Sequence, residues 1–101
     1  MRQKGFDAAD LFRLRSVSLQ QALAALGLHF RKDAEFAPVK QAGTERWYVS
    51  VDGGVFELVV TGTKWFDPHE GRGGGGAIDL AMHLWRLDFV GAVKRLLSAG
   101  L

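Results

Sequence analysis

A run of glycines interrupted by one arginine has the clearest chemical potential in the sequence. Gly71-Arg72-Gly73-Gly74-Gly75-Gly76 stands directly before an apolar segment, 77–86, that we expect to be a helix. Glycine backbone at a helix start can turn its N–H groups toward a phosphate, and Arg72 would add a forked donor. The run lacks the Gly-Lys-Ser/Thr ending of a P-loop and the βαβ surroundings of a dinucleotide fingerprint. We expect contact with a phosphate backbone; a tight connection between sheet and helix and a nucleotide pocket are the alternatives.

Aromatic side chains concentrate in two short segments that also carry basic residues. Arg46-Trp47-Tyr48 and Lys64-Trp65-Phe66 have the composition of strands. Side chains alternate between the faces of a sheet, so some of these rings must point outward. An exposed ring beside a cation is a platform for stacking unpaired bases. We expect Tyr48 or Trp65 to stack on bases, with Trp65 outward if Phe66 points inward; filling a thin core is the competing role.

Residue types suited to catalysis or metal binding are few. Cysteine is absent, which excludes disulfides, thiolate nucleophiles and zinc sites that need sulfur. His29, His69 and His83 stand far apart, and no two share the short spacing of a metal motif. His69 has Asp67 and Glu70 as near neighbours, without a further ligand at fixed spacing. We therefore predict no catalytic residue, no metal and no cofactor. The expected class is a binding protein and not an enzyme.

The elements expected to position these residues form an α+β domain. Turn residues at 52–54 and at Gly62 separate three consecutive strand patterns, which predicts a three-stranded antiparallel meander. The expected strands are 46–51, 55–61 and 64–66. The expected helices are 7–14, 19–26, 77–86 and 88–99. Residues 1–6 are expected to be an irregular lead-in, and residues 29–43 a loop with one short strand.

Length and composition fit a single globular domain over residues 1–101. The chain is 48% hydrophobic and 24% charged, which excludes a wholly disordered protein. No apolar run approaches the roughly 18 residues of a membrane span, and no signal-peptide stretch follows the basic N-terminus. We expect a cytoplasmic protein without a membrane partner. The net charge of +2 permits nucleic-acid binding without requiring it.

The C-terminal part of the chain resembles a known family, the N-terminal zinc-binding domain of DnaG-type bacterial primases. The segments that carry the resemblance are Gly74-Gly75-Gly76-Ala77-Ile78-Asp79-Leu80-Ala81-Met82, Asp88-Phe89, Ala92-Val93 and Leu96-Leu97. The family reads Gly-Gly-Asp-Ala-Ile, an apolar helix, Ser-Phe and a closing Glu-Ala-Val helix. Val17–Leu28 is similar to its leading helix, and the meander falls where its zinc-ribbon strands lie. The resemblance covers about residues 16–99 and is most specific over 74–97.

The zinc ligands of that family are missing. Where it has Cys-x-x-His and Cys-x-x-Cys, this chain reads Phe36-Ala37-Pro38-Val39 and Lys64-Trp65-Phe66-Asp67-Pro68-His69. The chain therefore resembles the cysteine-free relatives that precede Toprim-type domains in plasmid and mobile-element primase-like proteins. Loss of zinc removes a folding contribution on the order of 10 kcal/mol, which an apolar cluster must replace. The side chains expected in that cluster are Trp47, Val49, Phe56, Leu58, Trp65 and Phe66.

The resemblance implies a non-catalytic accessory domain that contacts single-stranded DNA, or RNA, in a primase-like replication or mobilisation protein. Its partners would include a Toprim or primase catalytic domain or a helicase. The residues expected to contact nucleic acid are Arg46, Tyr48, Lys64, Trp65, Arg72, Gly73 and Gly74. The alternative is a protein-docking module that has lost DNA binding. It is favoured by residues 51–101, which carry one more acidic than basic side chain.

Overall fold

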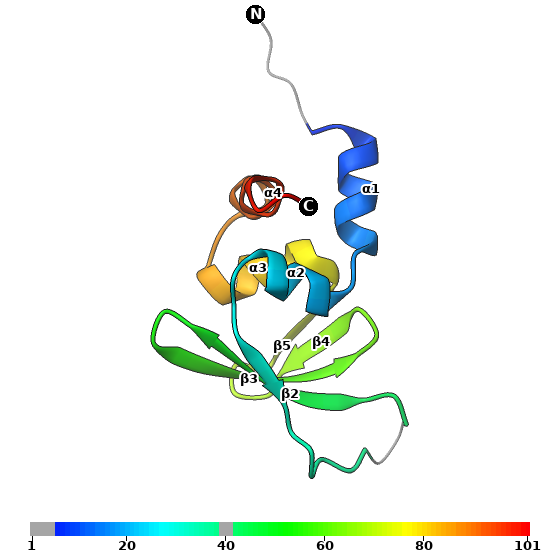
Figure 1. The fold of residues 1–101 in the computed structure, drawn as a ribbon, viewed down its shortest axis with the longest axis vertical. Helices are drawn as coiled ribbons and strands as arrows, with labels where there is room; N and C mark the ends of the chain where they lie inside the picture. The colour runs from blue at the N-terminus through cyan, green and yellow to red at the C-terminus, as the bar shows by residue number, and fades with distance from the viewer. Residues whose placement is uncertain (1–5, 39–41) are drawn as a thin grey trace, which may run out of the picture.

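Four helices cover one face of a five-stranded antiparallel sheet in the part of the chain that the structure describes (Figure 1). The structure is a computed structural model that describes residues 6–38 and 42–101. The irregular lead-in expected before Phe6 and the position of Val39 lie outside these residues. The α+β class expected from the sequence is confirmed. The sheet has five strands, the three of the predicted meander with one more on each side, and the first of these additions falls within residues 29–43, where one short strand was expected.

The two N-terminal helices begin and end at the expected signals. α1 spans Ala8–Ser16, and the side chain of Asp7 accepts the N–H of Ala9. α2 spans Leu19–Ala25 and begins with a capping box between Ser18 and Gln21. Just after the helix, Gly27 has a φ of +74°, and the N–H of Leu28 donates to the carbonyl of Leu23 at 2.9 Å. This is a Schellman ending, so the local sequence alone specifies where α2 stops.

The strands follow one another across the sheet in chain order, each antiparallel to the next. They are β1 (Phe30–Lys32), β2 (Glu45–Val51), β3 (Gly54–Thr61), β4 (Lys64–Asp67) and β5 (Arg72–Gly75). Asp52 and Gly53 both have positive φ, as a tight β2–β3 hairpin requires. β5 was expected to be a loop, because a run of glycines has no β-branched or aromatic side chains to indicate a strand. Backbone pairing with β4 nevertheless places it in the sheet.

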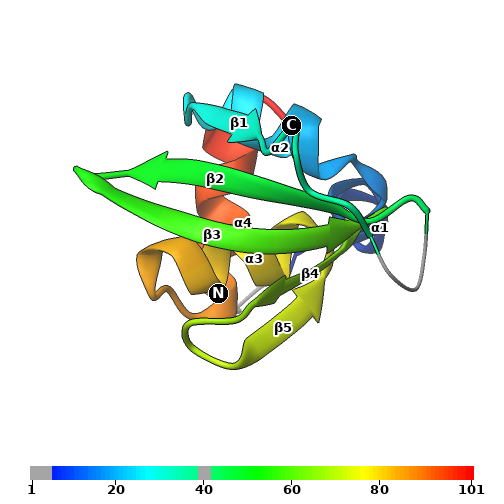
Figure 2. The same ribbon diagram turned by 90° about the horizontal axis from the view of Figure 1, so that it is seen from below.

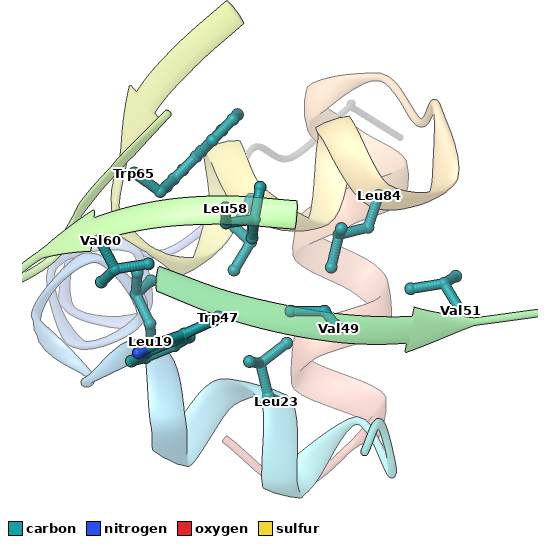
Figure 3. Close-up of a cluster of buried hydrophobic side chains, with 10 residues drawn as sticks. Leu19, Leu23, Trp47, Val49, Val51, Leu58, Val60, Trp65 and Leu84 are labelled. Carbon is teal, nitrogen blue, oxygen red and sulfur yellow. The ribbon is translucent and has the colours of Figure 1, made fainter. Parts of the chain in front are cut away.

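The hydrophobic core lies between the sheet and the helices, and side-chain alternation decides which residues enter it. Trp47, Val49 and Val51 of β2 are buried, as are Leu58 and Val60 of β3. Figure 3 shows these side chains gathered with Leu19 and Leu23 of α2. Of the cluster expected to replace zinc, Trp47, Val49, Leu58 and Trp65 are buried and Phe56 is partly buried. Phe66 does not belong to it, because its side chain is on the other face of the sheet.

The C-terminal helices complete the second layer and connect it to the sheet. α3 spans Gly76–Trp85 and directly follows β5, and α4 spans Phe89–Ser98. Asp88 caps α4 by accepting the N–H of Gly91 at 2.7 Å. A second buried cluster joins all four helices; its members are Leu14, Ala22, Ala77, Ile78, Ala81, Ala92, Val93 and Leu96. All four helices lie on the same side, which leaves the opposite face of the sheet uncovered by helices (Figures 1 and 2).

Candidate nucleic-acid interface

The uncovered face of the sheet carries the side chains that alternate with the core residues. We call it the open face; Figure 2 shows the sheet from this side, with the helices behind it. Cross-strand pairing aligns Arg46 with Val59, Val59 with Phe66, and Phe66 with Gly73, so a row of side chains runs from β2 to β5. The side chains of the open face used below are Arg31, Arg46, Tyr48, Glu57, Val59, Lys64 and Phe66.

Phe66 is the exposed aromatic ring of this row. Its relative exposure is 46%, whereas that of Trp65 is 5%. Phe66 thus points outward and Trp65 inward, the reverse of the arrangement in which Trp65 would stack on bases. The β3–β4 turn pairs Trp65 with the inward residue Val60, and this register fixes the direction of every side chain in β4. Gly73 lies beside the ring of Phe66: a Cβ added to Gly73 would be 3.2 Å from Cδ1 of Phe66.

Tyr48 is half-buried and is held by two neighbours. The guanidinium of Arg31 on β1 lies 4.6 Å from the centre of the Tyr48 ring. The Tyr48 hydroxyl donates to a carboxylate oxygen of Asp33 at 3.3 Å. One side of the ring is thus covered by the exposed cation Arg31. Arg31 was not singled out by sequence reasoning, because the short β1 has no strong strand pattern.

Arg46 is the most closely surrounded cation of the open face. Its guanidinium lies 3.6 Å from the Asp33 carboxylate and 3.4 Å from that of Glu57, and 4.8 Å from the ring centre of Phe36. The Tyr48 hydroxyl first, and then the Glu57 and Asp33 carboxylates, raise the pKa of Arg46 against the smaller opposing effect of its desolvation. Arg46 is therefore a fixed cation whose charge is largely balanced by its neighbours.

Three cations of the sheet strands, Arg31, Lys64 and Arg72, have no ion-pair partner among the described residues. Arg31 and Lys64 are exposed and belong to the open face. Arg72 is also exposed, but it pairs with the inward residue Asp67 and so lies on the helix side of β5. The structure therefore brings Arg46, Tyr48 and Lys64 onto one face and separates Arg72 from them.

The glycines do not form a loop open to a phosphate. The N–H of Gly75 donates to Asp79 at 3.1 Å, and that of Gly76 donates to the carbonyl of Thr63 at 2.8 Å. A Cβ on Gly74 would lie 2.9 Å from Cζ2 of Trp65 and 3.0 Å from Cβ of Asp79. Glycine is needed at this position because β5 passes directly against the Trp65 ring. The geometry matches the alternative of a tight connection between sheet and helix.

A buried acid–histidine pair lies under the end of β4. Asp67 Oδ2 is 2.8 Å from Nε2 of His83, and Oδ1 accepts the N–H groups of His69 and Glu70 at 2.9 and 3.1 Å. Burial by itself raises the pKa of Asp67, but the hydrogen bonds from His83, Glu70 and His69 outweigh it and lower the pKa. The ring of His69 instead turns to Glu57, 3.3 Å away. The histidine ring that contacts Asp67 is therefore that of His83 on α3, and His69 contacts Asp67 only through its backbone N–H.

Among the described residues, Asp67, Glu70 and His83 form a group that could hold a metal ion. One ligand atom of each lies within 4.8 Å of the others. Each already has a partner, since Asp67 binds His83 and Glu70 forms an ion pair with Arg86 at 3.0 Å. A metal would have to displace these contacts, and the arrangement as it stands connects β4 to α3.

Comparison of the chain with protein-family models, with curated proteins and with solved structures finds no match. Within the described ranges, none of the helices has the length and apolar character that crossing a membrane requires.

Proposed function

We propose that the open face binds single-stranded nucleic acid. The observation that carries the proposal is the exposed ring of Phe66 on a helix-free sheet face, with the cations Arg31 and Lys64 on the same face. Aromatic rings stack on unpaired bases, and unpaired cations attract the backbone phosphates. Phe66 thereby takes the stacking role that the sequence assigned to Trp65.

A second stacking position is provided by Arg31 over Tyr48. A guanidinium plane stacks on bases as an aromatic ring does, and here it is held 4.6 Å from the ring beneath it. β2 and β4 are two strands apart, on the order of 10 Å, and Tyr48 aligns with Glu57 whereas Phe66 aligns with Val59. Tyr48 and Phe66 can therefore serve two bases of one strand that need not be adjacent. Bases in a duplex are stacked on each other, and the arrangement therefore favours a single strand.

The resemblance of residues 74–97 to the primase zinc-binding domain gives this activity a context. We infer a non-catalytic accessory domain of a primase-like replication or mobilisation protein in the cytoplasm, which holds single-stranded DNA near a Toprim or primase catalytic domain. A helicase is a further partner of the same context. The strand would be held without base specificity, because stacking and phosphate contacts read no sequence.

The experiment is fluorescence anisotropy with a labelled single-stranded oligonucleotide and the duplex of the same sequence. Two phosphate contacts, from Arg31 and Lys64, predict a loss of affinity of roughly five- to tenfold between about 50 and 200 mM salt. We expect the single strand to bind more tightly than the duplex, with that salt dependence. Equal affinity for both, or no binding of the single strand at tens of micromolar protein in low salt, would contradict the proposal.

A protein-docking function is the second candidate, and exposed apolar side chains on the helical layer favour it. Phe12 of α1 is 73% exposed, and Phe89 and Val90 of α4 are 36% and 45% exposed. A docking domain would show amide chemical-shift changes in α1 and α4 when a primase catalytic domain or a helicase is added. Changes confined to the sheet, or none, would oppose this function.

A further inference from the structure

A pocket lies on the other side of β5 from the open face, between this strand and α3. Its volume is about 380 Å³, within the range of small-ligand sites. The residues that line it are Trp65, Arg72, Gly73, Asp79, Met82, His83, Arg86 and Leu87. β5 can approach Trp65 closely because its residues are glycines, so the glycine run shapes one wall of the pocket.

Two guanidinium groups line the pocket, those of Arg72 and Arg86. Arg72 has no ion-pair partner in the described part of the chain, so its five N–H donors remain available for a ligand. Arg86, at the end of α3, is oriented by its ion pair with Glu70 and has a largely exposed side chain. Forked donors of this kind match the oxygens of a phosphate.

The remaining lining is mixed, which argues against a site for a plain anion. Met82 and Leu87 supply an apolar wall. Oδ2 of Asp79 accepts the N–H of Gly75. Within residues 6–38 and 42–101 the Asp79 carboxylate accepts no other hydrogen bond, so Oδ1 can accept one from a ligand. Trp65 is 95% buried, and its indole N–H has no hydrogen-bond partner among the described residues. The lining thus offers donors, an acceptor and an apolar surface together.

We propose that this pocket binds a single nucleotide. The phosphate binds Arg72 and Arg86, the base lies against Met82 and Leu87, and Asp79 accepts a hydrogen bond from an amino or hydroxyl group of the ligand. An inorganic phosphate would use the arginines alone and leave the apolar wall and Asp79 without a partner. The inference goes beyond the proposed function, since none of these groups belongs to the open face.

The test is a titration of the ¹⁵N-labelled full chain with deoxynucleoside 5′-monophosphates, followed by NMR. The indole N–H of Trp65 and the amide of Gly73 belong to residues that line the pocket and report on it directly. We expect saturable shifts of these signals with the nucleotides, and much weaker binding of the nucleosides and of inorganic phosphate. Arg72→Ala should weaken nucleotide binding about tenfold or more, the effect of losing a charged hydrogen bond.

The matched control is Arg31→Ala, which removes an exposed arginine without an ion-pair partner from the far edge of the sheet. It should leave the nucleotide titration unchanged while lowering affinity for single-stranded DNA, so the two proposals can fail separately. Three results would overturn the inference: no shift of the pocket signals at about 10 mM nucleotide, far above ordinary ligand affinities; inorganic phosphate binding as tightly as the nucleotide; or an equal loss in both variants.

Discussion

The carboxylate of Asp67 and the imidazole of His83 form a buried pair with 2.8 Å between Oδ2 and Nε2. Each side chain is only 3% exposed, and the pair joins the last residue of β4 to the middle of α3. The His83 ring lies against Trp65, with 4.8 Å between ring centres, and meets Phe56 edge-on at 5.6 Å. A carboxylate can only accept, so His83 donates. The sheet and α3 are thus held together by a polar contact inside an aromatic cluster.

Asp67→Asn should lower the free energy of unfolding by about 2–3 kcal/mol at neutral pH, because it removes the charged acceptor of three hydrogen bonds. The effect should depend on pH. The folded-state pKa of Asp67 is lowered, so its stabilisation is present above the ordinary aspartate pKa and is lost as the pH falls through the folded value.

Urea denaturation of the parent and of Asp67→Asn between pH 7 and about pH 3, below the ordinary aspartate pKa, measures this contribution. The stability difference between the two proteins should shrink on acidification. A difference that stays constant over this range would show that the ionised carboxylate is not the stabilising group.

Gly74→Ala should destabilise the fold by about 1–3 kcal/mol, the usual cost of overpacking. The added Cβ would be 2.9 Å from Trp65 and 3.0 Å from Asp79, and neither neighbour is free to move away. Gly75→Ala is the matched control, since a Cβ there meets nothing within 4 Å and its φ of −139° suits any residue. Its stability should change by no more than about 0.5 kcal/mol. Equal thermal denaturation midpoints for the two variants would refute the close approach.

Trp65→Ala should lower the free energy of unfolding by about 3–5 kcal/mol, because it empties a core position that is 95% buried. Phe66→Ala, one residue along the strand, should change it by less than about 1 kcal/mol, because the Phe66 ring is half-exposed. Guanidinium denaturation of both variants measures the contrast. A Phe66 variant as unstable as the Trp65 variant would mean that the Phe66 ring is also part of the core.

The sequence predicts well the elements whose ends are marked by local chemistry. The Ser18 capping box, the glycine after α2, the Asp52-Gly53 hairpin and the Asp88 cap all act within four residues, so pattern alone locates them. β5 could not be predicted in this way, because backbone pairing with β4 rather than side-chain pattern makes it a strand.

The candidate site was predictable only in part. Arg46, Tyr48 and Lys64 were identified and do share one face, but the direction of Trp65 depends on the β3–β4 register. A two-residue turn pairs Thr61 with Lys64, and therefore Val60 with Trp65. If Val60 points inward, Trp65 must also point inward, which leaves Phe66 as the outward ring. Partners far apart in the chain, such as Asp67 with His83, follow only from the tertiary fold.

The most direct test of nucleic-acid binding by the open face is the affinity of Phe66→Ala for single-stranded DNA, with Phe12→Ala as control. Both variants remove an exposed phenylalanine ring, one from the sheet face and one from the helical layer. Anisotropy titrations at the same salt concentration should show about a tenfold loss for Phe66→Ala, as expected for one stacked base, and no loss for Phe12→Ala. Unchanged affinity of Phe66→Ala, or a larger loss for Phe12→Ala, would contradict binding at the open face.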